Sequence, residues 1–298
     1  MSTVAIHALS AGLDDAERLS ARLGVVLHPI DLHRFPDGEL RVTIATATDT
    51  AIVYAPLDQP NDKLLALLFA AEAFRRGGTS RLLLVAPYLC YMRQDIAFQK
   101  GEAISQKVVG RLLASSFDRV ITVDAHLHRT HNIQDVFPGI EAEDLSSVPA
   151  IADALQRGGF DAATVIVGPD EESRPWVSEL ANRLGVKFAV AKKHRRSDRS
   201  VEISFPQPGI LAGSPALIVD DIVSSGGTLV ACAEALRAAG VTGVDAVVTH
   251  PLYPPELAHA FFQAGIRSIR STTSIPHPTN AISLDGLLTN ALRREVGP

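Results

Sequence analysis

The sequence predicts an α/β fold built on a parallel β-sheet, and three observations lead to this expectation. Short apolar runs alternate along the chain with segments of helical periodicity, which is the β-α-β pattern of a parallel sheet. The apolar runs show no alternation with polar residues, as expected for central strands that are covered on both faces. The 298 residues are enough for two domains, and a polar stretch at residues 141–149 (EAEDLSSVP) separates two such halves.

The expected strands are apolar runs of strand length. They are residues 81–87 (RLLLVAP), 119–124 (RVITVD), 164–169 (TVIVGP), 216–221 (ALIVDD) and 244–250 (VDAVVTH). Three of them end in, or lead directly into, aspartate: Asp124, Asp170 and the pair Asp220 and Asp221. Because the carboxyl ends of parallel strands meet at one edge of a sheet, these acidic residues mark that edge as the place for a ligand.

The expected helices are amphipathic segments with recognisable ends. They span residues 62–76, 105–117, 176–184 and 227–239. Asn61 is expected to cap the first helix, and Gly77, Gly185 and Gly240 are expected to end the first, third and fourth. We therefore expect an N-terminal domain at residues 1–144, a C-terminal domain at 145–285 and a C-terminal helix at 286–298.

Composition and charge exclude several classes of protein. Hydrophobic residues make up 46% of the chain and the formal net charge is −5, which excludes a disordered chain and argues against sequence-independent nucleic-acid binding. No apolar run is long enough to span a bilayer, and the N-terminus lacks a signal-peptide pattern. Cys90 and Cys232 lie far apart in apolar contexts and are expected to be reduced, packed thiols. We expect a cytoplasmic protein that binds neither nucleic acid nor membrane.

The most informative segment is residues 219–229 (VDDIVSSGGTL), where an apolar strand leads into a helix. Small residues let backbone N–H groups approach a phosphate closely, and a helix N-terminus adds partial positive charge. Asp220 and Asp221 suit ribose hydroxyls or Mg²⁺ rather than phosphate. The loop and helix start are formed by Ser224, Ser225, Gly226, Gly227 and Thr228. The segment predicts a sugar-phosphate site, and a helix cap that binds no ligand is the alternative.

Residues 219–229 resemble the phosphoribosyl-diphosphate (PRPP) binding loop of type I phosphoribosyltransferases and of ribose-phosphate diphosphokinases. Four further segments resemble the diphosphokinases in particular. The first, residues 34–42 (RFPDGELRV), is similar to a segment that contacts the ATP adenine across a subunit interface in that family. The resemblance implies an ATP-binding role for Phe35, Asp37, Gly38 and Glu39. From the residues alone, Asp-Gly indicates a turn, so a plain hairpin is the alternative.

The second and third segments follow the expected strands at 81–87 and 119–124. Residues 86–104 (APYLCYMRQDIAFQKGEAI) place Arg93 for the ATP phosphates, with Gln94 and Asp95 to orient ATP or the water shell of its metal. Residues 122–134 (TVDAHLHRTHNIQ) place His126 at the family's metal-linked histidine. Together with His128 and His131, this histidine could instead form part of a transition-metal site, or the latter two could be ordinary loop residues.

The fourth segment, residues 168–193, departs from the family pattern. Asp170 stands at the family's magnesium-linked aspartate, but Glu172 and Ser173 replace two glycines, so that P-D-x-G-G becomes PDEES. The following residues, 189–203 (AVAKKHRRSDRSVEI), are similar to the family's catalytic loop in its archaeal form. The alignment places the catalytic lysine at Lys193 and its partner at Arg195, and a shift of one residue would select Lys192 or Arg196.

The resemblance covers nearly the whole chain and implies both fold and activity. The implied fold has two similar domains of the type I phosphoribosyltransferase kind, each a central parallel sheet flanked by helices. The implied reaction transfers the diphosphoryl group of ATP to the C1 hydroxyl of ribose 5-phosphate and gives PRPP and AMP. Mg²⁺, held near His126 and Asp170, would be the cofactor. Arg195 and the segment from Asp220 to Thr228 would bind ribose 5-phosphate, and adenine contact across subunits would require a homodimer or a higher homo-oligomer.

Two alternatives remain open from the sequence. A non-catalytic regulatory paralogue of the diphosphokinase is favoured by the PDEES departure, and the retention of Lys193, Arg195, Asp170 and His126 argues against it. A phosphoribosyltransferase that consumes PRPP would share the loop at residues 219–229, but the N-terminal segments would then have no role.

Overall fold

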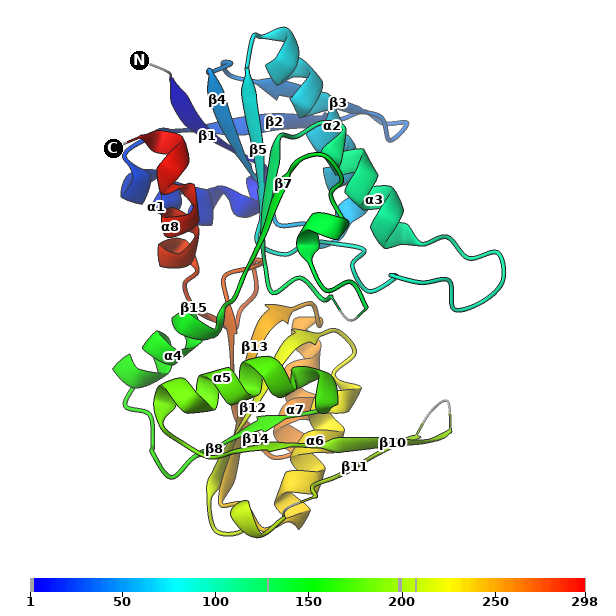
Figure 1. The fold of residues 1–298 in the computed structure, drawn as a ribbon, viewed down its shortest axis with the longest axis vertical. Coiled ribbons are helices and arrows are strands. Elements are labelled where there is room, and N and C mark those ends of the chain that lie inside the picture. Colours follow the sequence, from blue (N-terminus) through cyan, green and yellow to red (C-terminus); the bar gives the residue numbers. More distant parts are fainter. Residues whose placement is uncertain (1–2, 128, 198–199, 207, 298) are drawn as a thin grey trace. The chain divides into compact units, whose positions relative to one another are not determined.

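The computed structural model describes residues 3–127, 129–197, 200–206 and 208–297, with the backbone alone for 193–197, 200–202 and 208. The chain divides into two compact units (Figure 1). Unit 1 comprises Met1–Ser146, Ser274–Pro276 and Leu284–Pro298, and unit 2 comprises Ser147–Thr273 and His277–Ser283. The C-terminal segment therefore belongs to the same unit as the N-terminal segment.

Unit 1 is built on a seven-stranded sheet with the strand order β3-β2-β1-β4-β5-β6-β7. The strands are β1 (Val4–Ala8), β2 (Val26–Arg34), β3 (Leu40–Ile44), β4 (Thr50–Tyr54), β5 (Arg81–Ala86), β6 (Arg119–Val123) and β7 (Glu141–Leu145). Neighbours are parallel except β2 and β3, which form an antiparallel hairpin. The helices are α1 (Leu13–Leu23), α2 (Pro60–Arg76), α3 (Ser105–Ala114) and α8 (Asp285–Val296), with 3-10 turns η1 (Ser10–Gly12) and η2 (Ile133–Asp135).

Unit 2 is built on a fully parallel six-stranded sheet with the order β15-β14-β13-β12-β8-β9. Its strands are β8 (Val165–Gly168), β9 (Phe188–Val190), β12 (Pro215–Val223), β13 (Gly243–Pro251), β14 (Ile266–Thr272) and β15 (Asn280–Ile282). A separate antiparallel hairpin is formed by β10 (Lys192–Ser197) and β11 (Ser200–Ser204). The helices are α4 (Val148–Arg157), α5 (Arg174–Leu184), α6 (Gly227–Ala238) and α7 (Ala258–Gln263), with 3-10 turns η3 (Glu171–Ser173), η4 (Pro208–Ile210) and η5 (Pro255–Leu257).

The sheet of unit 2 has an apolar layer on each face. Leu217 and Val219 of β12 pack with buried residues of α4 and α5. Ala216 and Ile218 point to the opposite face and pack with buried residues of α6 and α7. Since successive side chains of a strand point to opposite faces, a run without polar residues is needed to fill both layers. This is why the apolar runs of the sequence become central strands, and the predicted α/β fold with helix-flanked, mainly parallel sheets is confirmed.

The boundaries differ from the prediction where local chemistry decides them. Helix α2 begins at Pro60, because proline fits the first turn of a helix, and its N-cap is Gln59. The predicted cap Asn61 is therefore wrong, and its side chain instead accepts a hydrogen bond of 2.5 Å from the Tyr91 hydroxyl. Helix α3 ends at Ala114, three residues earlier than predicted. Cys90 and Cys232 are free and buried.

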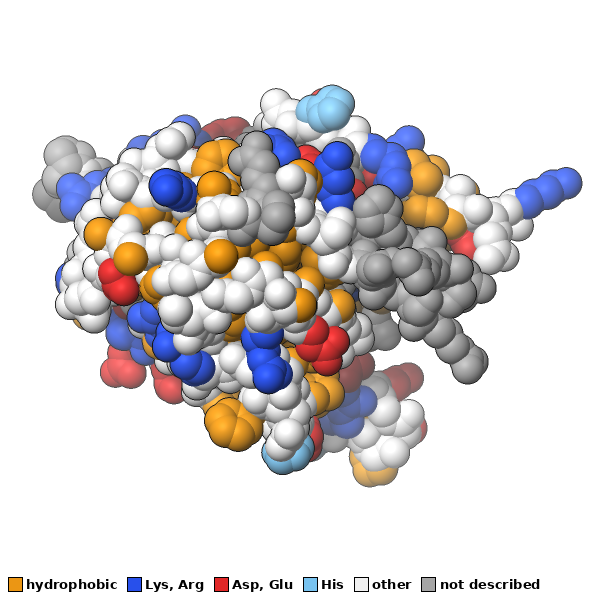
Figure 2. Space-filling view, turned by 90° about the horizontal axis from the view of Figure 1, so that it is seen from below, with side chains coloured by type: hydrophobic (Ala, Val, Ile, Leu, Met, Phe, Trp, Pro, Cys, Tyr) orange, Lys and Arg blue, Asp and Glu red, His pale blue; other side chains and the backbone are white. Residues whose placement is uncertain are grey.

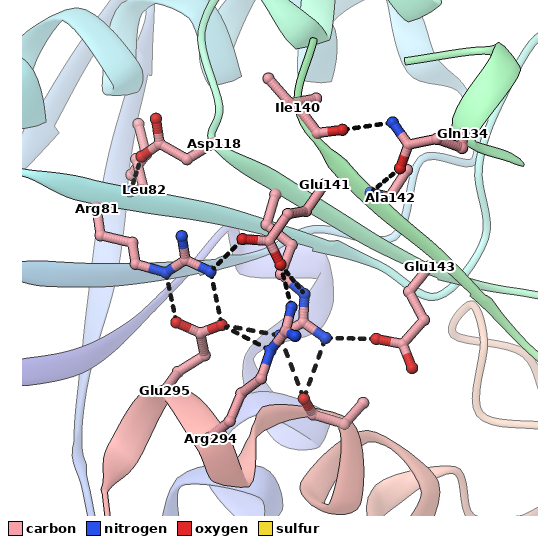
Figure 3. Close-up of polar contacts among 12 residues, drawn as sticks. Arg81, Leu82, Asp118, Gln134, Ile140, Glu141, Ala142, Glu143, Arg294 and Glu295 are labelled. Atoms are coloured by element: carbon pink, nitrogen blue, oxygen red, sulfur yellow. Dashed lines mark hydrogen bonds and ion pairs between the residues drawn. The ribbon is translucent and has the colours of Figure 1, made fainter. Parts of the chain in front are cut away.

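Charged side chains hold the last helix against the sheet of unit 1 through hydrogen bonds and ion pairs (Figure 3). Arg81, the first residue of β5, donates to both carboxylate oxygens of Glu295 at 2.6 and 2.9 Å. Arg119, the first residue of β6, donates to Glu295 at 2.9 Å and to the Ala291 carbonyl at 3.2 Å. Glu141, the first residue of β7, accepts from Arg81 at 3.0 Å and also from Arg294 of α8. The amino ends of three neighbouring strands thus hold α8, which also packs beside α1.

Among the described residues, no helix has the length and apolar character needed to cross a membrane. Figure 2 shows one face, on which small groups of Lys and Arg side chains are separated from one another by apolar and uncharged groups. The described part of this face therefore presents no continuous basic track.

Candidate active site

Acidic residues gather at the carboxyl edge of the sheet in unit 2. Strands β8 and β12 pair in register, with Val167 opposite Ile218. Asp170 follows the end of β8, and Asp220 lies near the end of β12, so the two residues share one edge of the sheet. Burial raises the pKa of the nearby Cys232 thiol, and the charges of Asp220 and Asp170 raise it further. Both carboxylates therefore lie close enough to raise the pKa of the same buried thiol.

The aspartates at this edge are held by backbone N–H groups. Asp170 Oδ1 accepts a hydrogen bond from Ser173 N at 3.3 Å. Asp220 Oδ1 accepts from Asp221 N at 3.1 Å, and Asp221 Oδ1 accepts from Ile222 N at 2.7 Å. These bonds fix the directions in which the carboxylates point.

The loop between β12 and α6 requires a glycine at its tightest point. Gly226 has a φ of 75°, in the left-handed region, and is the N-cap residue of α6. A Cβ atom at this position would lie 2.5 Å from Cε1 of Phe261, so even alanine would collide with the ring. Val230 N donates to the Gly226 carbonyl at 3.0 Å and starts the helix. The first N–H groups of a helix have no partner within it, so this turn can present them to an anion.

The PDEES segment forms a turn that needs no glycine. Ser173 is fully buried, and its hydroxyl donates to the Asp170 carbonyl at 2.6 Å. Its φ is −73°, and Glu172, which is exposed, is not among the described non-glycine residues with positive φ. Gly168 lies against the Ser173 hydroxyl, where a Cβ would overlap it. The departure from the family pattern is therefore accommodated by an ordinary helical turn that keeps Asp170 at the edge of the sheet.

In unit 1, unusual backbone conformations follow three neighbouring strands. Gln59, Tyr91 and Asp124 come after β4, β5 and β6, and their φ angles are 45°, 63° and 41°. Positive φ is strained for residues with a Cβ and is enriched at functional sites. The carboxyl edge of this sheet is therefore a second candidate for ligand binding, and it carries the Arg93 and His126 segments.

The Arg93 segment is organised by contacts that the sequence did not reveal. The Gln94 amide donates to the Ile96 carbonyl at 3.3 Å and to Glu102 at 3.4 Å. Asp95 is only 7% exposed, and it accepts from Nη1 of Arg129 at 2.8 Å. Arg93 itself is exposed. Neither Arg129 nor Glu102 was identified as a site residue from the sequence. The only signal was that Arg129 is a lone arginine among the histidines of residues 126–131.

The RFPDGE segment forms the turn of the β2–β3 hairpin. Phe35 N donates to the Glu39 carbonyl at 2.8 Å, and Glu39 N donates to Asp37 Oδ1 at 3.1 Å. Gly38 has a φ of 94° and closes the turn. The Phe35 ring is 38% exposed and packs edge-on against His33, with 4.8 Å between ring centroids. The turn residues are exposed, and their contact with adenine stays a prediction.

The two residues proposed to be linked to the metal, His126 and Asp170, belong to different units of the chain. His126 is half-buried in unit 1, and Asp170 is half-buried in unit 2. Carboxylate oxygens are the donors that Mg²⁺ prefers, so the aspartates at the edge of unit 2 fit this ion chemically. Among the described residues, no three His, Cys, Asp or Glu side chains gather where they could share a metal ion. His128 lies outside the described residues.

The predicted catalytic pair lies on the β10–β11 hairpin of unit 2. In its backbone register, Lys193 is opposite Ile203 and Arg195 is opposite Val201. The side chains of Lys193 and Arg195 lie outside what the structure describes.

Comparison with known proteins identifies the family. Residues 4–116 match the model of the N-terminal domain of ribose phosphate pyrophosphokinase, and residues 148–257 match that of the phosphoribosyl transferase domain. A ribose-phosphate pyrophosphokinase of Methanopyrus kandleri is 32% identical over 281 residues, which are 94% of this chain and 95% of the relative. One from Pyrococcus furiosus is 31% identical over 268 residues, covering 88% and 92%.

The fold agrees with that of a solved structure. The crystal structure of phosphoribosylpyrophosphate synthetase from Mycobacterium smegmatis superposes with a TM-score of 0.85. It covers 99% of this chain and 100% of its own, at 24% sequence identity. This likeness extends over both units, whereas the phosphoribosyl transferase model alone covers part of unit 2. The chain therefore belongs to the ribose-phosphate pyrophosphokinase (diphosphokinase) family.

Proposed function

We propose that the chain transfers the diphosphoryl group of ATP to the C1 hydroxyl of ribose 5-phosphate. The C1 oxygen attacks the β-phosphorus, the bond from that phosphorus to the α-phosphate oxygen breaks, and AMP leaves with PRPP as the other product. Family membership supports the proposal. The observation that carries it is the carboxyl edge of unit 2, where the loop closed by Gly226 opens helix α6 beside Asp170 and Asp220. A phosphate suits the helix N–H groups, and ribose hydroxyls suit the carboxylates.

The loop side chains have assigned roles in this reaction. The hydroxyls of Ser224, Ser225 and Thr228 and the backbone of Gly226 and Gly227 bind the 5-phosphate. Asp220 and Asp221 bind the ribose hydroxyls, and Arg195 also contacts ribose 5-phosphate. Phosphoryl transfer depends mainly on positioning and on neutralising charge. We assign that neutralisation to Lys193 and Arg195 on the β10–β11 hairpin.

ATP and its metal are assigned to the remaining segments. Arg93, with Gln94 beside it, binds the nucleotide phosphates. The exposed hairpin turn of residues 35–39 contacts the adenine bound by a second copy, so the active form is at least a homodimer. Asp170 would hold Mg²⁺ with the help of His126, and the bound ion would supply charge neutralisation at the phosphates. The two free, buried thiols fit the cytoplasmic location that we propose.

The test is a product assay with the purified protein. The protein is incubated with ribose 5-phosphate, MgCl₂ and ATP, and AMP and PRPP are followed together. We expect the two products in equal amounts. If no AMP forms although PRPP binds, the chain is a regulatory paralogue or a transferase rather than a diphosphokinase.

A further inference from the structure

We propose that Arg129 is a positioning residue for nucleotide binding. Its guanidinium forms an ion pair with the buried Asp95, which we call the clasp. This ion pair holds the loop that carries Arg93 against the loop that carries His126. The kinetic part of this inference rests on the proposed function, whereas the contact itself lies wholly within unit 1. Asp95 thus supports the site through Arg129 rather than binding ATP.

The Asp95–Arg129 contact is an ion pair with one buried member. Arg129 Nη1 lies 2.8 Å from Asp95 Oδ1, and Arg129 N donates to Asp95 Oδ2 at 3.3 Å. The Asp95 side chain is 2% exposed, while the Arg129 side chain is 53% exposed. A buried carboxylate is costly unless it is paired and hydrogen-bonded, so Asp95 depends on Arg129. Both carboxylate oxygens are used, which fixes the position of the arginine backbone as well as its side chain.

A second set of contacts joins the same two loops beside this pair. The Arg129 guanidinium carbon lies 5.7 Å from the centre of the Phe98 ring, within the range of a cation–π interaction. The Thr130 hydroxyl donates to Gln106 Oε1 at 2.9 Å. Gln106 in turn donates from its side chain to the Met92 carbonyl at 3.3 Å. Two consecutive residues of the loop after β6 are thus tied to the segment after β5.

These contacts bracket the residues proposed to bind ATP and its metal. Gln106 N donates to the Gln94 carbonyl at 3.2 Å, so the residues on both sides of Arg93 are held by one glutamine. His126 lies three residues before Arg129, and the preceding Ala125 N is held by Asp144 at 2.9 Å. The distance between Arg93 and His126 therefore depends on the Asp95–Arg129 ion pair. A small misplacement of a binding group can cost a large factor in rate, so loosening the clasp should be visible in kinetics.

The experiment compares variants of the full-length protein at saturating Mg²⁺. Arg129→Gln and Asp95→Asn each remove the ion pair, and Arg129→Lys keeps the charge but not the planar fork. Arg111→Gln is the matched control, since Arg111 is an exposed arginine on α3 of the same unit. We expect Arg129→Gln to raise the KM for ATP by about tenfold, with less than about a twofold change in the KM for ribose 5-phosphate. Arg129→Lys should restore part of the loss.

The double variant and hydrogen exchange distinguish positioning from general damage. Because both residues serve one contact, Arg129→Gln with Asp95→Asn should lose no more than the worse single variant. Exchange of the amides in residues 87–104 should quicken in Arg129→Gln and stay unchanged in Arg111→Gln. Additive losses, equal changes in both KM values, or unchanged exchange would overturn the proposal. A wild-type protein that forms no AMP would instead reject the proposed function, while the exchange measurement would still decide whether the clasp exists.

Discussion

Arg119 and Glu295 form an ion pair of 2.9 Å in which the two side chains are only 2% and 5% exposed. The pair joins the first residue of β6 to the last turn of α8. Burial raises the pKa of the Glu295 carboxyl, but the hydrogen bonds and charges of Arg81 and Arg119 outweigh it, and the pKa lies below its usual value. Glu295 is therefore ionised at neutral pH and serves as the shared counter-charge of Arg81 and Arg119, with Arg294 also 3.4 Å away.

We expect Glu295→Gln to lower the free energy of unfolding by about 3 kcal/mol, because it leaves Arg119 buried with a weakened counter-charge. The control is Glu72→Gln, which breaks an exposed pair with Arg76 of 3.0 Å. That change should cost less than about 0.5 kcal/mol. Urea unfolding at pH 7 measures both values, and similar losses in the two variants would contradict the structural role of Glu295.

The buried His7 should make stability depend on pH. Burial, together with the nearby His28, lowers the pKa of His7 to about 4 from 6.5, and neither ring nitrogen has a hydrogen-bond partner in the described structure. The unfolded chain therefore binds the extra proton as pH falls below 6.5, and the folded protein loses stability down to about pH 4. The loss at pH 5 should be about 2 kcal/mol relative to pH 7.

Replacing His7 isolates this contribution. His7→Leu removes the titrating group from an apolar site, so its stability should fall less between pH 7 and pH 5 than that of the wild type. His259→Gln changes an exposed histidine of α7 and should leave the wild-type pH dependence unchanged. Thermal unfolding at the two pH values measures the difference. An equal pH dependence in His7→Leu and the wild type would show that other groups cause it.

The Gly226 position tests the phosphate loop. Gly226→Ala combines strain at a φ of 75° with a collision at Phe261, so it should abolish ribose 5-phosphate binding and lower stability by about 2 to 3 kcal/mol. Gly240→Ala is the control, because its φ is 82° but no atom lies near the added Cβ. That variant should lose only about 1 kcal/mol and bind normally. Calorimetry with ribose 5-phosphate gives the comparison, and normal binding by Gly226→Ala would rule out this loop as the phosphate site.

The catalytic assignment is tested on the β10–β11 hairpin. Lys193→Ala should nearly abolish AMP formation, because it removes one of the two cations that we propose to neutralise the transferred phosphates, while the unfolding temperature stays the same. Lys192→Ala is the neighbouring control and should keep most of the rate. If Lys192→Ala is the inactive variant, the alignment is displaced by one residue. Full activity in both would reject a catalytic lysine at this hairpin.

The fold could be predicted where the signal is local. The runs that became β5, β6, β8, β12 and β13 are apolar because both of their faces are covered, and that requirement is visible in the sequence. The loop of residues 224–226 was also visible, since small residues at a strand-to-helix junction have a direct physical meaning. By contrast, the short strand β4 was missed, because a five-residue run (TAIVY) with no clear ends is ambiguous between strand and helix.

The contacts that organise the candidate site could not be predicted, because they join residues far apart in the chain. Asp95 and Arg129 are separated by 34 positions, and Arg119 and Glu295 by 176. No local pattern distinguishes an arginine that forms such a pair from one that does not. The left-handed backbone at Asp124 is equally hidden, since propensity argues against it and only the surrounding fold imposes it.

The return of α8 to unit 1 has a consequence for synthesis on the ribosome. Domains generally fold in order as the chain emerges, but α8 emerges only after the whole of unit 2 has been made. Until then Arg81 and Arg119 have no Glu295 to pair with, and the side of α1 that packs against α8 is uncovered. The unit that is translated first is thus the last to be completed. A premature stop codon before Asp285 would destabilise the N-terminal unit, although the sequence of that unit's sheet would be intact.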